Sequence, residues 1–210
     1  MTTKCDLCEA KYTETNKPFT RNGVSFCEMC VESAPFLRGP TNTPAPTTMS
    51  EEYYFHQTPR QCAKDLMPNI PLEKGDRVLE PFAGEGAFYD QLPDYVEKDW
   101  CEIERGRDYK DYDKEFDWVV SNPPFKIGGK NVIWGMIDYY TQRATKGVAF
   151  FVNAYGLTTL TPIRQAVLKE RGWGITGLTM VNVKKWSGRY FLIVLQKGKP
   201  SVMNYLSGNY

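Results

Sequence analysis

Beyond residue 57 the chain alternates between short apolar runs and amphipathic segments. Apolar runs bounded by glycine, proline or charged residues predict strands, and apolar positions spaced three to four residues apart predict helices. This alternation is typical of an α/β domain with a mostly parallel sheet covered by helices, in which the last two strands can pair as an antiparallel hairpin at one edge. The predicted strands are residues 77–80, 99–103, 116–121, 148–153, 175–183 and 190–196, and the predicted helices are residues 58–67, 132–145 and 162–171.

The first 48 residues follow a different pattern. Residues 39–48 contain three prolines, no charged side chain and no large apolar side chain, which is the composition of an extended linker. We therefore expect a small N-terminal module at residues 1–38, a linker at residues 39–48 and a larger domain at residues 49–210.

Two Cys-x-x-Cys pairs lie within the N-terminal module. Eighteen residues separate the pairs, a length that suits a short hairpin carrying Asn22 and Gly23 at its turn. Each pair can present two thiolates to one tetrahedral ion, so four sulfur ligands would form a structural Zn²⁺ site with no position for water. Two disulfides are the alternative, which a chain without a secretion signal disfavours. The expected ligands are Cys5, Cys8, Cys27 and Cys30.

The formal net charge of +1 conceals an uneven distribution. Residues 1–46 carry five basic and five acidic side chains, residues 47–142 carry eleven and nineteen, and residues 143–210 carry ten and one. A basic final third favours a polyanionic partner, although ordinary solvated surface charge gives the same count.

The composition limits the class of protein. Hydrophobic and charged fractions of 41% and 24% are those of an ordinary globular chain, which excludes a fibrous or disordered protein. No apolar run is long enough to cross a bilayer, and the first ten residues lack the composition of a signal peptide. We therefore expect a soluble intracellular protein of the cytoplasm, nucleoid or nucleus, with no membrane partner. The pattern does not specify an oligomeric state.

A glycine-rich turn follows the strand predicted at residues 77–80. Gly84 and Gly86 let the backbone approach a nucleoside cofactor closely, and Glu80 can receive a cationic amino group directly or through water. At the end of the next predicted strand, Glu102 can accept hydrogen bonds from ribose hydroxyls, with Glu104 as a rival for that role. A plain turn and a solvated acidic strand end are the alternatives.

The most specific motif is Ser121-Asn-Pro-Pro-Phe125, which follows an apolar strand. An exocyclic aromatic amine is a poor nucleophile because its lone pair is delocalised into the ring. The amide oxygen of Asn122 and the carbonyl of Pro123 can each accept one N–H of such an amine and localise that lone pair. Pro123 and Pro124 fix the backbone, and Phe125 offers a face for stacking a base. A rigid loop without chemistry is the alternative.

Residues 58–125 resemble the N6-adenine DNA methyltransferases of the class I S-adenosylmethionine-dependent fold, in particular those with an NPPY or NPPF motif. Thr58-Pro59 matches their TP motif near the cofactor carboxylate, residues 80–86 their cofactor loop, and Glu102 their ribose-binding acid. Asp108, beside Tyr109, matches the residue that binds the adenine amino group of the cofactor. Residues 122–125 match their catalytic motif.

The resemblance implies a Rossmann-like sheet with helices on both faces, S-adenosyl-L-methionine as cofactor, and methyl transfer to N6 of adenine without a catalytic metal. DNA is the expected substrate. A target adenine in a duplex would have to rotate out of the stack, with Phe125 replacing part of the lost stacking. The implied cofactor residues are Thr58, Glu80, Phe82, Gly84, Gly86, Glu102, Asp108 and Tyr109, and the implied catalytic residues are Asn122, Pro123, Pro124 and Phe125.

Two departures from the family affect these expectations. Only five residues separate Glu102 from Asp108, where the family fits a helix, so we expect one helix of the sheet's cover to be missing. The length also leaves no room for a separate target-recognition domain. Selectivity is then expected to come from the zinc module, residues 126–131, the basic final third or another subunit, or to be slight.

The turn predicted between the last two strands combines three cations with an aromatic ring. We expect its cations to contact phosphates and Trp186 to pack against a sugar or a base. A solvated turn remote from Asn122 is the alternative. The residues expected to bind nucleic acid are Lys126, Lys130, Lys184, Lys185, Trp186 and Arg189.

Three other functions compete with DNA methylation. Several RNA N6-adenine methyltransferases share the NPPF motif, so RNA is the runner-up substrate. Methylation of a protein glutamine amide uses a related NPPY motif, which Phe125 and the basic final third disfavour. A non-catalytic nucleic-acid-binding protein is the last alternative, against which the intact Asn122 and glycine loop speak.

Overall fold

The computed structural model describes residues 19–21, 24–26, 57–127, 130–184, 186 and 188–203, with the backbone alone described for residues 19–21, 24–26 and 130. The chain divides into two compact units, Met1–Glu52 and Tyr53–Tyr210. In the first unit, β1 (Phe19–Arg21) pairs antiparallel with β2 (Val24–Phe26), which confirms the hairpin predicted around Asn22 and Gly23. The predicted zinc ligands Cys5, Cys8, Cys27 and Cys30 lie outside the described residues.

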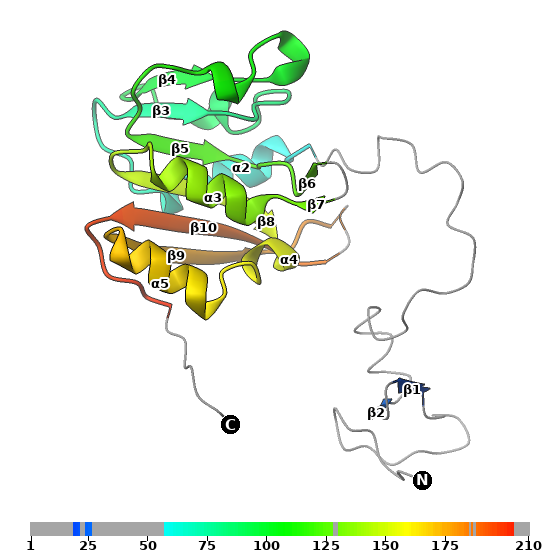
Figure 1. Ribbon diagram of the computed structural model, residues 1–210. Helices are drawn as coiled ribbons and strands as arrows, with labels where there is room; N and C mark the ends of the chain where they lie inside the picture. The colour runs from blue at the N-terminus through cyan, green and yellow to red at the C-terminus, as the bar shows by residue number, and fades with distance from the viewer. Residues whose placement is uncertain are drawn as a thin grey trace. The chain divides into compact units, whose positions relative to one another are not determined.

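The larger unit contains a six-stranded mixed sheet with strand order β4-β3-β5-β8-β10-β9 (Figure 1). The first four strands in this order run parallel, and β10 is antiparallel to both of its neighbours. This confirms the predicted, mostly parallel sheet with an antiparallel hairpin at one edge. The strands are β3 (Arg77–Glu80), β4 (Glu97–Trp100), β5 (Trp118–Ser121), β8 (Gly147–Asn153), β9 (Trp173–Val181) and β10 (Tyr190–Lys197).

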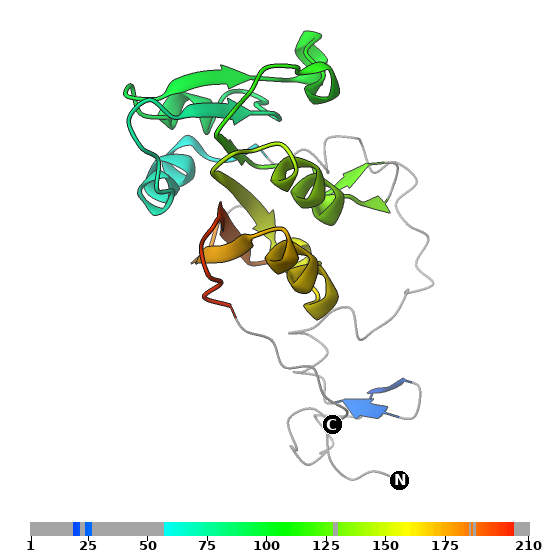
Figure 2. The same ribbon diagram turned by 60° about the vertical axis from the view of Figure 1, so that its left-hand side comes forward.

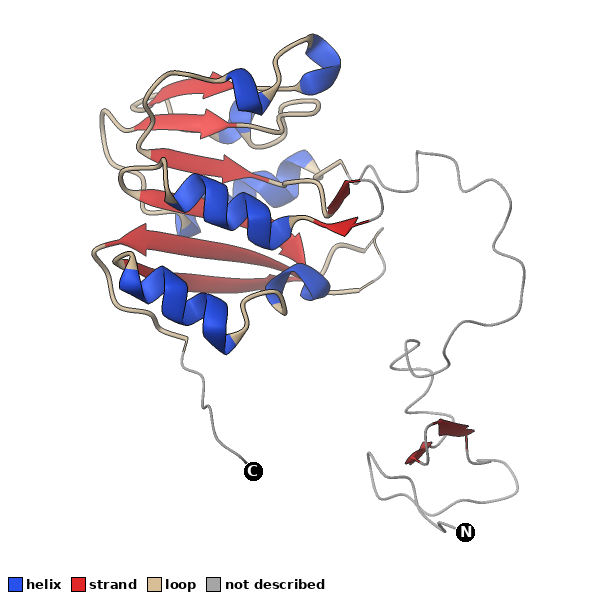
Figure 3. Cartoon of the chain, viewed as in Figure 1, coloured by secondary structure: helices blue, strands red, loops and turns tan. Residues whose placement is uncertain are grey.

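Helices cover both faces of this sheet, as expected. α3 and α5 contribute to the apolar cluster on one face, and α2 contributes to a second cluster on the other. Figures 2 and 3 show α3 and α5 on the same side of the sheet. None of the described helices is both long and apolar enough to span a membrane. The helices are α2 (Arg60–Leu66), α3 (Ile133–Thr141), α4 (Ala154–Leu157) and α5 (Pro162–Glu170), with 3₁₀ turns η3 (Met67–Asn69), η4 (Tyr89–Gln91), η5 (Ile103–Arg105) and η6 (Tyr109–Asp111).

The apolar spacing of α3 explains its place against the sheet. Ile133, Met136, Ile137 and Tyr140 recur on one face of the helix and are at most 5% exposed. Each such buried side chain contributes roughly 1.5–3 kcal/mol of transfer free energy. α5 begins with Pro162 at its first turn, and the Thr161 side chain accepts a hydrogen bond from the Arg164 N–H as its N-cap.

A glycine at the start of β8 allows close packing within the core. Trp118, at the start of β5, pairs with Gly147 and lies across it, so a Cβ at Gly147 would come within 2.1 Å of the indole ring. β8 is buried from Gly147 through Val152 because helices cover the sheet on both faces.

The segment after β3 departs from two sequence expectations. The second strand is displaced, since β4 covers Glu97–Trp100 rather than residues 99–103. Glu97 and Lys98 are exposed polar residues on an edge strand, and parallel pairing with β3 places them in the sheet despite their low strand propensity. The expected loss of a covering helix is confirmed, because residues 103–111 form only the 3₁₀ turns η5 and η6.

Candidate active site

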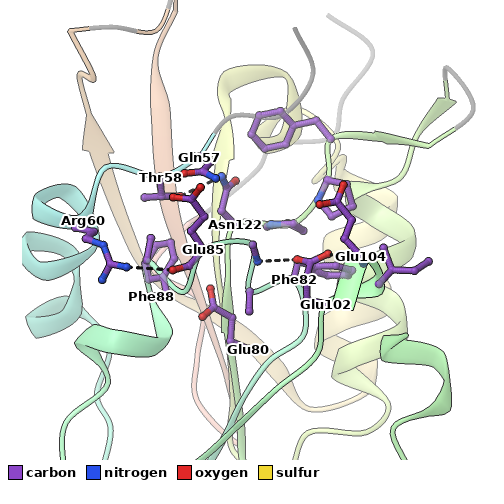
Figure 4. A pocket seen from close by; sticks show the side chains of 17 residues that line it. Gln57, Thr58, Arg60, Glu80, Phe82, Glu85, Phe88, Glu102, Glu104 and Asn122 are labelled. Atoms are coloured by element: carbon purple, nitrogen blue, oxygen red, sulfur yellow. Dashed lines mark hydrogen bonds between the residues drawn. The ribbon is translucent and has the colours of Figure 1, made fainter. Parts of the chain in front are cut away.

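A cavity of about 290 Å³ lies at the carboxyl ends of β3 and β5 (Figure 4). From β3 the chain passes first to β4 on one side and then to β5 on the other, so the strand order reverses at β3. Open α/β sheets bind ligands at such reversal points. The lining consists of Gln57, Thr58, Arg60, Glu80, Phe82, Ala83, Gly84, Glu85, Ala87, Phe88, Glu102, Ile103, Glu104, Asn122, Pro123, Pro124 and Phe125.

The glycine-rich turn forms one wall of the cavity and is attached to the segment after β4. The Gly84 N–H donates to Glu102 Oε2 at 2.6 Å, and the Ala83 N–H donates to the Cys101 carbonyl at 3.0 Å. Gly84 and Gly86 have φ values of 51° and 80°, which glycine adopts without strain. Gly86 shapes the turn but does not line the cavity.

Glu80 is a buried acid at the floor of the cavity. Its residue is 2% exposed, and its Oε2 accepts the Tyr89 N–H at 2.6 Å. Burial raises the pKa of Glu80 to about 9, with the neighbouring carboxylates of Asp90 and Glu102 adding to the shift. The chain supplies no cation to this carboxyl among the described residues. A cationic ligand group reaching Glu80 would therefore favour its ionised form.

Sequence reasoning overlooked the role of α2 in closing the site. Arg60, in the first turn of α2, forms an ion pair with Asp90 and donates to the Glu85 carbonyl at 3.2 Å. These contacts hold the glycine-rich turn against α2, and Figure 4 shows the bond to Glu85 beside the cavity. The signal available in the sequence was only the position of Arg60 directly after Thr58-Pro59.

Asn122 and Thr58 meet across the cavity although they are far apart in the sequence. The Asn122 Nδ2 donates to Thr58 Oγ1 at 3.1 Å. This bond fixes the orientation of the amide, so that Oδ1 is the atom that can accept a hydrogen bond from a ligand. Phe125 lines the same cavity, and its ring lies 6.4 Å from the Tyr190 ring, between centroids.

Besides Gly86, two residues expected at the cofactor site, Asp108 and Tyr109, do not line the cavity. The Asp108 side chain accepts the Lys110 N–H at 3.0 Å and so caps η6. Tyr109 packs against Phe82, with ring centroids 5.0 Å apart, and Phe82 does line the cavity. Tyr109 therefore supports a cavity residue from behind, and burial raises the pKa of its hydroxyl.

The basic turn between β9 and β10 lies at the same end of the sheet as the cavity. Tyr190, at the start of β10, pairs with Asn153 at the carboxyl end of β8. Trp186 is half-buried and packs against Tyr190 and Phe151, with centroids 4.7 and 6.1 Å away. Trp186 is part of the turn, and its ring contacts attach the turn to the sheet.

The structure describes only some of the residues that were expected to contact nucleic acid. Lys184 and Arg189 are exposed at the ends of this turn, and Lys126 is exposed on the segment after Phe125. Lys185 and the side chain of Lys130 lie outside the described part. Across the described residues, no group of three or more His, Cys, Asp or Glu could hold a metal ion.

Comparison with known proteins identifies the fold. No protein-family model and no curated protein sequence matches the chain. Among solved structures, it resembles the protein assigned as a modification subunit of a type I restriction enzyme from Vibrio vulnificus YJ016, with 13% identity, a TM-score of 0.53, and coverage of 72% of this chain and 46% of that one. It also resembles the protein assigned as a class I S-adenosylmethionine-dependent methyltransferase from Listeria monocytogenes, with 13% identity, a TM-score of 0.52, and coverage of 69% and 62%.

The chain spans about half to three fifths of the length of these two structures. At this level of identity the likeness concerns the fold. The larger unit therefore has the Rossmann-like fold of class I methyltransferases, as the sequence predicted.

Proposed function

We propose that the chain is an S-adenosylmethionine-dependent methyltransferase that acts on the exocyclic N6 amino group of adenine in DNA. One observation carries the proposal. The Asn-Pro-Pro-Phe motif at the end of β5 lines the same cavity as the glycine-rich turn and the acids after β3 and β4. A site for an acceptor amine and a site for a nucleoside cofactor thus share one space, which methyl transfer requires.

The cavity fits the cofactor chemically. Glu80 can take its cationic amino group, because this buried carboxyl has no cation of its own among the described residues. Glu102 can accept ribose hydroxyls, since Oε2 accepts the Gly84 N–H and Oε1 the Glu104 N–H, and each oxygen has a second lone pair. When bound, S-adenosylmethionine supplies an electrophilic methyl group on its sulfonium.

The catalytic motif is suited to prepare an aromatic amine. Asn122 Oδ1 and the Pro123 carbonyl would accept the two N–H groups and so concentrate the lone pair on nitrogen. Thr58 would keep the amide in that orientation through its bond to Nδ2. Phe125 would stack on the base, and its contact with Tyr190 limits the tilt of its ring.

The decisive experiment supplies labelled S-adenosylmethionine with DNA, RNA and protein acceptors in parallel. We expect label in DNA, recovered as N6-methyladenine after enzymatic digestion and mass spectrometry. Label in RNA or in a glutamine side chain would replace the proposed substrate, and cofactor binding without transfer would indicate a non-catalytic binding protein. Asn122→Ala is the matched control for any transfer observed.

We further propose that Cys5, Cys8, Cys27 and Cys30 bind one structural Zn²⁺. In the sequence the β1–β2 hairpin lies between the two pairs, which is the order of elements expected for such a site. Metal analysis of protein purified without chelator should give one zinc per chain. Cys5→Ser should lose the ion while the thermal unfolding of the larger unit stays unchanged, and metal-free parent protein would refute the site.

A further inference from the structure

A small hairpin follows the catalytic motif directly. β6 (Lys126–Ile127) pairs antiparallel with β7 (Lys130–Asn131), and the register places Ile127 opposite Lys130. Two bonds fix this hairpin, one across its base and one between β7 and the first residue of α3. The Val132 N–H donates to the Phe125 carbonyl at 3.2 Å, and the Ile133 N–H donates to Asn131 Oδ1 at 3.0 Å. The hairpin is therefore fixed between a cavity residue and the first turn of α3.

The hairpin carries an exposed apolar side chain two residues beyond the last cavity residue, Phe125. Ile127 is 51% exposed, whereas Ile133 and Ile137, a few residues further on, are completely buried. One exposed isoleucine is ordinary on a protein surface, so its position is what matters. Ile127 is two residues beyond Phe125, within about 7 Å along an extended backbone. Figures 1 and 2 show the hairpin extending from the end of the sheet where the carboxyl end of β5 lies.

This position suits a specific step that the proposed function requires. An adenine inside a duplex cannot reach the cavity until it leaves the stack, and unstacking it costs free energy. Proteins that kink DNA insert apolar side chains, isoleucine among them, between neighbouring bases. Lys126, directly before Ile127, is also exposed, and a lysine beside an inserted apolar side chain can neutralise a phosphate of the DNA.

We propose that Ile127 is a wedge that enters base-paired DNA and holds it open while the target adenine occupies the cavity. The inference rests on the proposed function and narrows its substrate to duplex DNA. Asn122 and Phe125 receive the base, and Ile127 stabilises the distorted duplex beside it. The contribution of Ile127 should therefore depend on whether the acceptor is base-paired.

The test compares native and heat-denatured fragments of the same unmethylated genomic DNA, so that both acceptors contain the same sequences. For Ile127→Ala, the loss of kcat/KM on the native duplex should exceed the loss on single strands by about tenfold or more. Ile127→Met, which retains a long apolar side chain, should recover most of the duplex activity. Val202→Ala is the control, because Val202 is 66% exposed and follows β10 at the opposite end of the sheet.

The outcomes separate the wedge from the proposed function. Equal losses on both acceptors, or no loss on the duplex, would overturn the wedge and leave DNA methylation intact. A parent protein that methylates only single strands would do the same. A parent protein that methylates neither form would overturn both. A cofactor titration on each variant shows that the cavity has folded, so a misfolded variant cannot pass as a positive result.

Discussion

The amino ends and the carboxyl ends of the parallel strands both carry buried or half-buried carboxyl groups, and the two sets differ in their partners. At the amino ends, Asp117 accepts two hydrogen bonds from the Arg77 side chain, and Asp76 pairs with Lys146 at 2.6 Å. At the carboxyl ends, Glu80 accepts a backbone N–H, and the cavity lies beside it.

The difference distinguishes acids that have a counter-ion within the fold from Glu80, which we propose binds a cationic ligand group. Hydrogen bonds from Arg77 lower the pKa of Asp117, and bonds to Asp76 and Glu73 raise the pKa of Lys146, so each charge already has its counter-ion. Burial raises the pKa of Glu80 to about 9 because no such cation is present among the described residues. The same residue type therefore stabilises the fold at one end of the sheet and remains available to a cationic ligand at the other.

The largest effect is expected at the carboxyl end, where the chemistry is proposed. Asn122→Ala should lower kcat for methyl transfer by roughly 10²- to 10³-fold and leave cofactor affinity nearly unchanged, because the amide is proposed to contact the acceptor amine and not the cofactor. Asn153→Ala is the matched control, since Asn153 ends the adjacent strand β8 and caps α4 without lining the cavity. Near-normal turnover of Asn122→Ala would refute the assignment.

Glu80→Gln should change cofactor binding and protein stability in opposite directions. The raised pKa means that the folded protein loses stability as pH rises from the unfolded value of about 4.5 toward 9. The amide removes that penalty and keeps an acceptor for the Tyr89 N–H, so the free energy of unfolding at pH 7.5 should rise by ~1–3 kcal/mol. Cofactor affinity should fall by about tenfold or more. Calorimetry of both proteins measures the two changes, and a destabilised variant would contradict the comparison.

Asp117→Asn should have the opposite profile. The change weakens the hydrogen bonds from Arg77 and removes a charge that Arg77 faces, so the free energy of unfolding should fall by ~1–3 kcal/mol. Cofactor affinity should not change, because Asp117 lies at the amino end of β5. A denaturant titration tests the lower stability, and a cofactor titration on the same preparation tests the unchanged affinity. Weaker cofactor binding in a folded variant would show that the two ends are coupled.

The affinity for the cofactor should depend on pH through Glu80. At neutral pH the buried carboxyl holds a proton, and binding a cationic amino group would release it. Affinity should therefore increase between about pH 6 and 7.5, below the pKa of an α-amino group, by up to about tenfold per pH unit. Isothermal titration in buffers of different ionisation enthalpy would count the released proton. A slope that persists in Glu80→Gln would assign the proton elsewhere.

The smallest effect is expected from the basic turn. A Lys184→Ala, Lys185→Ala, Arg189→Ala variant should weaken DNA binding evenly across sequences and reduce the salt slope by roughly one unit for each phosphate that the protein no longer binds. Lys197→Ala, Lys199→Ala is the control, because these exposed residues lie at the other end of β10. Equal slopes for the parent and the turn variant would leave the turn as a solvated hairpin.

The order of elements was predictable because local patterns dominate in the buried strands. β3 has the predicted bounds, and the helices at residues 132–145 and 162–171 were found with errors at their ends. β4 was misplaced because its position depends on the pairing of Arg77 with Glu97, which leaves no trace in the local sequence. The place of β10 between β8 and β9 was likewise invisible, since strand order is a long-range property.

The candidate site was predictable only where a residue type is tied to its chemistry. Glu80, Glu102 and Asn122 line one cavity, and each ends or follows a strand in a recognisable motif. Arg60 was overlooked because its contacts reach Glu85 and Asp90, distant in sequence and without a motif. The inward packing of Trp186 was hidden for the same reason, since an aromatic residue in a basic turn gives no sign of what lies beneath it.

The place of β10 also affects the order in which the sheet can be completed during synthesis. β8 precedes β10 by almost forty residues, yet β10 is the strand that covers its open edge. Until residues 190–197 leave the ribosome, a nascent chain presents β8, with Phe150 and Phe151 on opposite faces, as an unpaired apolar edge. A nonsense mutation just before residue 190 would therefore yield an aggregating product rather than a shortened folded chain.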